Sequence, residues 1–245
     1  MRAVPVFLVA ALIAGPAPSV AAAASLAAAP SAQARVIVSF DGQRTAVFPD
    51  GWKARDQAAA ERVYCVASED GEQFLRAVAN GESEQIGFPV SFDIEDYPLL
   101  SWRWRVRELP AGARERDAAT NDSAAGVYVV FKGSLGGLLP RAIKYVWSTR
   151  EPQGTAIQSP GYSNSRIVVL ETSAELLGTW LTETVNVLED YRRLFGSEPP
   201  DMKGLALLTD ADDTGSRASA DYGAFSMLPL DTAGASAARI ARPAR

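Results

Sequence analysis

Short hydrophobic runs, several of them alternating with polar residues, recur along the chain from about residue 35 onward. They fall at residues 36–38, 45–48, 63–67, 74–78, 99–106, 126–131, 143–147, 167–170, 180–185, 205–209 and 222–228. Runs of this length that are rich in Val, Ile, Phe and Tyr are typical of β-strands with at least one buried face. The pattern therefore predicts an all-β domain.

Turn signals separate the first of these runs. Asp41-Gly42, Asp50-Gly51, Asp70-Gly71 and Asn80-Gly81 each follow a hydrophobic segment. Asp-Gly and Asn-Gly accept the positive φ angles of tight hairpin turns, which favours antiparallel pairing of the flanking strands. Many short strands with turns between them indicate two packed sheets, and we expect a two-sheet antiparallel, jelly-roll-like sandwich.

One segment predicts a helix instead of a strand. Asn186 and Glu189 have the spacing of a capping box, in which the Asn side chain caps the first turn. Apolar residues at helical spacing follow, and Gly196 supplies a stop signal before Pro199. We expect one short helix between Asn186 and Gly196.

The N-terminal segment has the pattern of a secretory signal. Arg2 precedes an apolar run at residues 3–14, and small-x-small cleavage sites follow at residues 21–23 and 32–34. The alternative is an uncleaved low-complexity tail. We expect a signal peptide and Ala-rich leader over residues 1–34, a sandwich domain over 35–230 and a disordered tail over 231–245. The mature chain, with no transmembrane segment, is then periplasmic or secreted.

Composition excludes several kinds of chemistry. The chain has no histidine and one cysteine, so the Ser-His-Asp, Cys-His and histidine-zinc arrangements are absent. The formal net charge of −5 disfavours nucleic acid as a partner, because phosphate binding needs a basic surface. No catalytic residue is assigned from the sequence.

The strand at residues 99–106 offers a candidate binding surface. Alternation places Trp102 and Trp104 on one face and Arg103 and Arg105 on the other. Leu100 and other apolar residues share the tryptophan face, which favours a core position for the tryptophans over a sugar-stacking platform. The arginines are then the polar residues of the surface.

Two interpretations of these arginines are open. As a ligand site, completed by Tyr128 and Glu183, they suit a glycan or another anionic ligand, because guanidinium groups bind carboxylate and sulfate bidentately. Alternatively, Glu183 or Asp190 pairs with them inside the protein for stability.

An acidic loop offers a candidate metal site. Counted from Asp210, oxygen ligands fall at Asp210, Asp212 and Thr214, and Asp221 occupies the twelfth position, which is the spacing of a calcium loop. The twelfth residue is Asp instead of Glu, and strands flank the loop. We expect either a structural calcium ion or an Asp-rich turn that caps itself.

Several segments together resemble a known family. Residues 97–106, 127–131, 143–147, 186–196 and 209–215, with Tyr222-Gly223 after them, are similar in sequence and order to the bacterial domain-of-unknown-function 3047 family. The resemblance covers roughly residues 36–228. It implies an exported, jelly-roll-like domain and brings no established activity.

The leading functional hypothesis is an exported, non-catalytic domain that binds an extracytoplasmic ligand, with a glycan favoured. A carbohydrate-active enzyme, a lyase or hydrolase that uses Tyr, Arg and carboxylates, is the second hypothesis. An envelope structural or assembly protein is the third.

Overall fold

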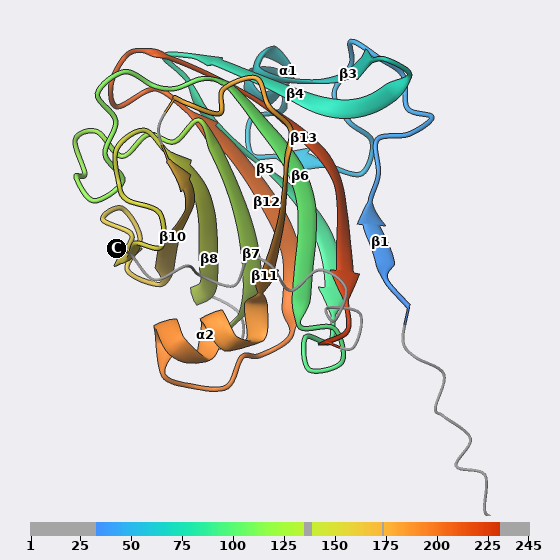
Figure 1. Cartoon of the computed structure of the whole chain (residues 1–245), viewed down its shortest axis with the longest axis vertical. Coiled ribbons are helices and arrows are strands. Elements are labelled where there is room, and N and C mark those ends of the chain that lie inside the picture. Colours follow the sequence, from blue (N-terminus) through green and yellow to red (C-terminus); the bar gives the residue numbers. More distant parts are fainter. Residues whose placement is uncertain (1–32, 135–138, 173, 231–245) are drawn as a thin grey trace, which may run out of the picture. The chain divides into compact units, whose positions relative to one another are not determined.

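The computed structural model describes residues 33–134, 139–172 and 174–230, which fold into two packed β-sheets with two short helices (Figure 1). Sheet A consists of β1 (Arg35–Val38), β3 (Tyr64–Glu69), β4 (Glu72–Asn80), β6 (Leu99–Glu108), β11 (Leu181–Asn186) and β13 (Arg217–Leu228). Sheet B consists of β2 (Lys53–Ala54), β5 (Ser83–Phe92), β7 (Ala125–Ser134), β8 (Leu139–Ser148), β9 (Ala156–Gln158), β10 (Ser165–Thr172) and β12 (Met202–Asp210). The predicted signal peptide, most of the leader and the predicted tail lie outside the described residues.

The topology confirms the predicted jelly-roll-like sandwich. Sheet A runs in the order β11-β6-β13-β4-β3, with β1 also paired to β13, and sheet B in the order β2-β5-β12-β7-β8-β10-β9. The chain therefore changes sheet at each step from β4 to β7 and again from β11 through β12 to β13. All pairs are antiparallel except β8 with β10, which the sequence did not indicate.

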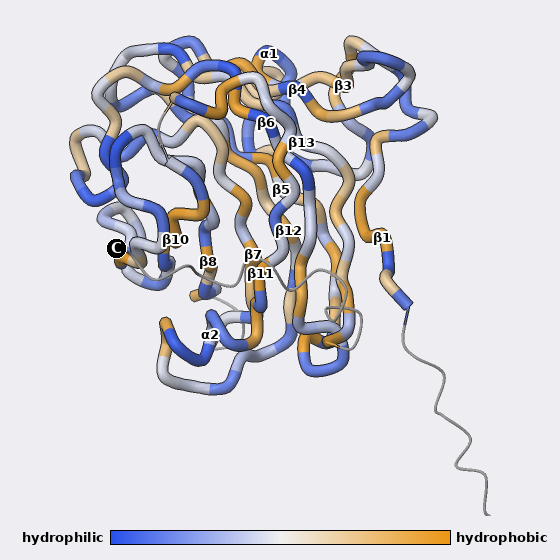
Figure 2. The backbone as a smooth tube through the Cα atoms, in the orientation of Figure 1, coloured by the Kyte–Doolittle hydropathy of each residue, from blue (hydrophilic) through white to orange (hydrophobic). Residues whose placement is uncertain are grey.

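Strand alternation fills the space between the sheets with apolar side chains. Figure 2 shows how hydropathy changes along the strands. Trp102 and Trp104 are 1% and 0% exposed, which confirms their predicted core position. Their rings meet edge to face at 5.4 Å, and Trp104 contacts Trp147 of the opposite sheet at 6.0 Å. Burial of such large aromatic groups is a major contribution to the stability of a sandwich.

The two helices both begin at a side-chain cap. In α2 (Val187–Phe195), Asn186 accepts a hydrogen bond from the Glu189 N–H at 3.1 Å, and Gly196 ends the helix at φ +65°, as the sequence predicted. A second helix, α1 (Gln57–Val63), was not predicted. There Asp56 accepts from the Ala59 N–H at 3.0 Å. No helix among the described residues is long and apolar enough to cross a bilayer.

Two local expectations need correction. Residues 45–48 form a turn and not a strand, because Ala46 has φ +60° and only isolated backbone bonds join this segment to Val66 of β3. Conversely, β5 is a ten-residue strand that was missed, since its Gly, Pro and polar residues obscure the alternation.

Candidate functional site

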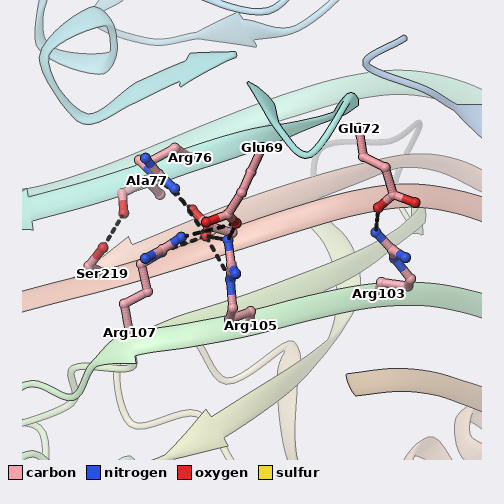
Figure 3. Close-up of polar contacts among 9 residues, drawn as sticks. Glu69, Glu72, Arg76, Ala77, Arg103, Arg105, Arg107 and Ser219 are labelled. Atoms are coloured by element: carbon pink, nitrogen blue, oxygen red, sulfur yellow. Dashed lines mark hydrogen bonds and ion pairs between the residues drawn. The ribbon is translucent and has the colours of Figure 1, made fainter. Parts of the chain in front are cut away.

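The outer face of sheet A carries four arginines and their acidic partners. Arg103, Arg105 and Arg107 project from β6 and Arg76 projects from β4, as strand alternation requires. Figure 3 shows Arg76, Arg105 and Arg107 converging beside Glu69, while Arg103 meets Glu72 at a separate point of the same face. We call this group, together with Asp221 of β13, the arginine face.

Asp221 is the central acceptor of the arginine face. Its Oδ2 accepts hydrogen bonds from Arg105 at 2.7 Å and Arg107 at 2.6 Å, and its Oδ1 accepts from Arg76 at 2.9 Å. Asp221 is 0% exposed and Arg105 is 7% exposed. A buried carboxylate is tolerated only where charged or hydrogen-bonding partners replace water, and three guanidinium groups meet this requirement.

The two glutamates of this face lie nearer to solvent. Glu69 accepts a hydrogen bond from Arg105 at 2.5 Å, and this bond holds the pKa of the Glu69 carboxyl below its ordinary value. Glu72 pairs with Arg103 at 2.6 Å. All four arginines of the arginine face are therefore already paired with carboxylates of the protein.

Trp180, just before β11, covers part of the arginine face. Its ring centroid lies 4.9 Å from the guanidinium carbon of Arg103, 4.6 Å from that of Arg105, and 5.4 Å from the Phe74 ring. Since both arginines project outward from β6, Trp180 lies on the solvent side of them, and it is half-buried. Beside it is a hollow of about 240 Å³ lined by Glu69, Asp70, Glu72, Phe74, Arg105 and Trp180.

The four residues of the predicted ligand site do not lie together. Arg103 and Arg105 share a face, but Tyr128 belongs to β7 and points to the outer face of sheet B. Glu183 faces the core side of sheet A, where it is 5% exposed and accepts a hydrogen bond from the Trp104 indole N–H at 3.2 Å. Alternation predicts which residues share a strand face but not which sheet a strand joins.

The predicted internal partners also differ from those observed. Asp190 accepts a hydrogen bond from the Tyr145 hydroxyl at 2.9 Å and pairs with Arg193. The arginines use Glu69, Glu72 and Asp221 instead. The β3–β4 hairpin and β13 bring these carboxylates to the face, which no local sequence pattern encodes.

A second polar group, which we call the lysine cluster, lies on the outer side of sheet B and comprises Glu115, Ser123, Tyr128, Lys144 and Asp210. Lys144 is 3% exposed, donates to the Ser123 hydroxyl at 3.1 Å and has its ammonium 5.5 Å from the Tyr128 ring centroid. The aliphatic part of the Lys144 side chain passes over Gly126, where an added Cβ would lie 2.8 Å from Lys144 Cε. Glycine at this position is what allows the lysine to reach across β7.

Burial shapes the acid–base behaviour of the lysine cluster. Burial raises the pKa of Glu115, which accepts a hydrogen bond from Ser148 at 2.6 Å, and raises the pKa of Asp210 to about 8. Burial alone would lower the pKa of Lys144, but Tyr128 and the nearby carboxyl groups outweigh it and raise the pKa above its ordinary value. The cluster is thus a set of mutually dependent buried groups.

The predicted calcium loop is only partly assembled. Asp210 and Asp212 meet Asp122, and one carboxylate oxygen of each lies within 4.8 Å of the others. Thr214 donates to Asp122 at 2.5 Å. Asp221 is not part of this group, because β13 carries it into the arginine face. Asp122, from the loop before β7, was not predicted.

Of the residues around the hollow, only Arg105 was assigned to a binding site from the sequence. Asp70 was interpreted only as a turn residue, and Trp180 only as the start of a strand. The available signal was an aromatic residue two positions after the turn-forming Gly178, outside the core-facing alternation of β11.

Comparison with known proteins identifies one family. The sequence profile described as "Protein of unknown function (DUF3047)" matches residues 50–226. No curated protein matches the chain.

Several solved structures are similar at low identity. The family 11 carbohydrate-binding module of a Clostridium thermocellum cellulosomal cellulase shares 9% identity at a TM-score of 0.40, with 81% of this chain and 95% of that chain covered. The Trichoderma harzianum endoglucanase 3 of family GH12 shares 10% identity at a TM-score of 0.42, with 80% and 97% covered. The Roseburia intestinalis xylan-binding module CBM86 shares 10% identity at a TM-score of 0.34, with 83% and 100% covered. Similarity at this level assigns no ligand.

Proposed function

Since the chain belongs to the DUF3047 family of proteins of unknown function, we propose its role from its own surfaces: a non-catalytic domain that binds a neutral glycan at Trp180. The domain acts outside the cytoplasm, in keeping with the signal-like N-terminal sequence.

The observation that carries the proposal is the half-buried Trp180 beside a hollow lined by polar groups. One side of the indole rests on Arg103 and Arg105, which orients the ring before any ligand arrives. A pyranose ring presents C–H groups on its faces, which pack on an aromatic ring, and hydroxyls at its edge. The carboxylates and Arg105 around the hollow supply acceptors and donors for those hydroxyls.

The charge balance favours a neutral ligand over the anionic ligand expected from the arginines alone. Arg76, Arg103, Arg105 and Arg107 pair with three carboxylates, those of Glu69, Glu72 and Asp221. Asp70 adds a fourth negative charge at the edge of the hollow. An incoming carboxylate or sulfate would have to displace an internal partner and leave that partner unpaired. A neutral saccharide needs no such exchange.

Glu69 is not suited to act as a general acid in this hollow. A glycosidase needs one carboxylic acid that stays protonated near neutral pH, which requires a raised pKa. The pKa of Glu69 is instead lowered by Arg105. This favours binding over bond cleavage as the role of Glu69.

The test is a glycan array of neutral and acidic oligosaccharides probed with the wild-type chain and Trp180→Ala. We expect binding to neutral glycans, weakened about tenfold or more by Trp180→Ala, which corresponds to about 1.4 kcal/mol. Tyr162→Ala is the matched control, because Tyr162 is an aromatic residue 40% exposed on another part of the surface. Binding restricted to acidic glycans, or binding that Trp180→Ala leaves unchanged, would overturn the proposal.

A further inference from the structure

We propose that Asp122, Asp210 and Asp212 bind a calcium ion that ties the loop before β7 to the turn between β12 and β13. The three carboxyl groups come from two segments about ninety residues apart in the chain, and their nearest oxygens lie within 4.8 Å of one another. Asp122 and Asp210 are 0% and 6% exposed, whereas Asp212 is open to solvent. An ion could therefore enter from the Asp212 side.

An unsatisfied oxygen points independently to a ligand. Oδ1 of Asp210 is buried and has no hydrogen-bond partner among the described residues. Thr120 Oγ1 and Asn121 Oδ1, in the loop that carries Asp122, are likewise buried without a partner. Buried polar atoms without a partner are rare because each costs about 1–3 kcal/mol, so three oxygens at and beside one acidic cluster indicate a bound group.

The charges around the acidic cluster indicate that the bound group is a cation. Two of the three carboxyl groups are buried, and all three can be ionised together only where a cation lies between them. Lys144 faces Asp210, but its single ammonium also faces Glu115 and bonds Ser123, so it does not balance the cluster. A divalent cation supplies the positive charge that Lys144 does not provide.

The donor set selects calcium. The three ligand atoms that lie together are carboxylate oxygens, which suit a hard cation, and calcium accepts irregular arrangements of six to eight oxygens completed by water. Asp122 is held in place by hydrogen bonds from the backbone N–H groups of Asp213 at 3.2 Å and Thr214 at 2.8 Å. The turn is thus already folded around one ligand.

The experiment measures calcium binding to the full chain after chelation, by titration calorimetry and by thermal unfolding. Calcium at about a hundred times its dissociation constant should raise the melting temperature by about 5–10 °C. Asp212→Asn should remove both the binding heat and the rise, and it should fold normally because Asp212 is exposed.

Asp213→Asn is the matched control, since Asp213 is an exposed carboxylate of the same turn outside the three-residue cluster. It should keep the calcium response. Absence of a calcium response in the wild type overturns the proposal. An equal response in Asp212→Asn, or an equal rise with magnesium in both proteins, also overturns it, because either result would indicate a non-specific ion effect.

Discussion

Arg105 and Asp221 form a buried ion pair on the outer side of sheet A, with two Arg105 nitrogens 2.7 and 3.0 Å from Oδ2 of Asp221. The pair joins the adjacent strands β6 and β13. Asp221 also accepts a hydrogen bond from Arg76 of β4. One carboxylate on β13 therefore neutralises charge from the two strands that flank it, β6 and β4. This arrangement indicates that the inner part of the arginine face stabilises the fold. The half-buried Trp180, with the hollow beside it, is then the candidate binding surface.

Asp221→Asn should lower the free energy of unfolding by about 3–5 kcal/mol, because three guanidinium groups lose their buried counter-charge. Urea denaturation at neutral pH measures the loss. Arg103→Gln is the comparison, since the Arg103–Glu72 pair has side chains 41% and 66% exposed and should contribute about 1 kcal/mol or less. Equal effects of the two substitutions would contradict the assignment.

Trp104→Ala should destabilise the domain by about 3–5 kcal/mol, the usual cost of emptying a large aromatic core site. It also removes the indole N–H that donates a hydrogen bond to Glu183. Thermal and urea unfolding check the value. A stable Trp104→Ala protein with lost ligand binding would instead mean that this ring acts as a binding platform.

Gly126→Ala should destabilise the domain by about 1–3 kcal/mol, because the new Cβ would lie 2.8 Å from Lys144 Cε and 3.3 Å from the Leu208 carbonyl oxygen. Lys144 is buried and has little room to move. Gly161→Ala is the control, since an added Cβ there meets nothing within 4 Å, and its effect should stay within about 0.5 kcal/mol. Similar stability of the two variants would show that Lys144 is not held across Gly126.

The ion pairs of Glu69 and Glu151 should lose their contribution to stability below about pH 4.5. Arg105 lowers the pKa of Glu69, and Arg116 lowers the pKa of Glu151 through a bidentate bond. A carboxyl group with a lowered folded-state pKa contributes stability above its unfolded pKa, near 4.5, and loses it as the pH falls through the folded value. Urea midpoints between about pH 4.5 and pH 3, below the range in which Asp210 titrates, should show this loss, and Glu151→Gln should reduce it. A Glu151→Gln protein with an unchanged pH profile would argue against the Arg116 pair.

The sequence predicted the elements whose signals are local. Asn186 and Gly196 bound α2 through their own side-chain and backbone preferences, and the two-residue period of β6 separated Trp102 and Trp104 from the arginines. Residues 45–48 and β5 were misjudged because local hydrophobicity there does not match the pairing that the tertiary structure imposes.

The site depended on contacts that have no local signal. Asp221 completes the arginine face only because β13 lies between β6 and β4. Asp122 joins Asp210 only because the loop before β7 meets the β12–β13 turn. Tyr128 was assigned to the arginines because alternation leaves the sheet of its strand undetermined. Glu183 was assigned to them because alternation does not show which face of β11 turns to the core.

The most direct test of glycan binding at Trp180 is acrylamide quenching of tryptophan fluorescence. Of the five tryptophans, Trp52, Trp102, Trp104 and Trp147 are at most 5% exposed, so Trp180 dominates the quenchable signal. A neutral oligosaccharide that binds the chain should protect this signal, and Trp180→Phe should show little quenching with or without the ligand. Binding of the glycan with wild-type quenching unchanged would place the ligand elsewhere and contradict the proposed function.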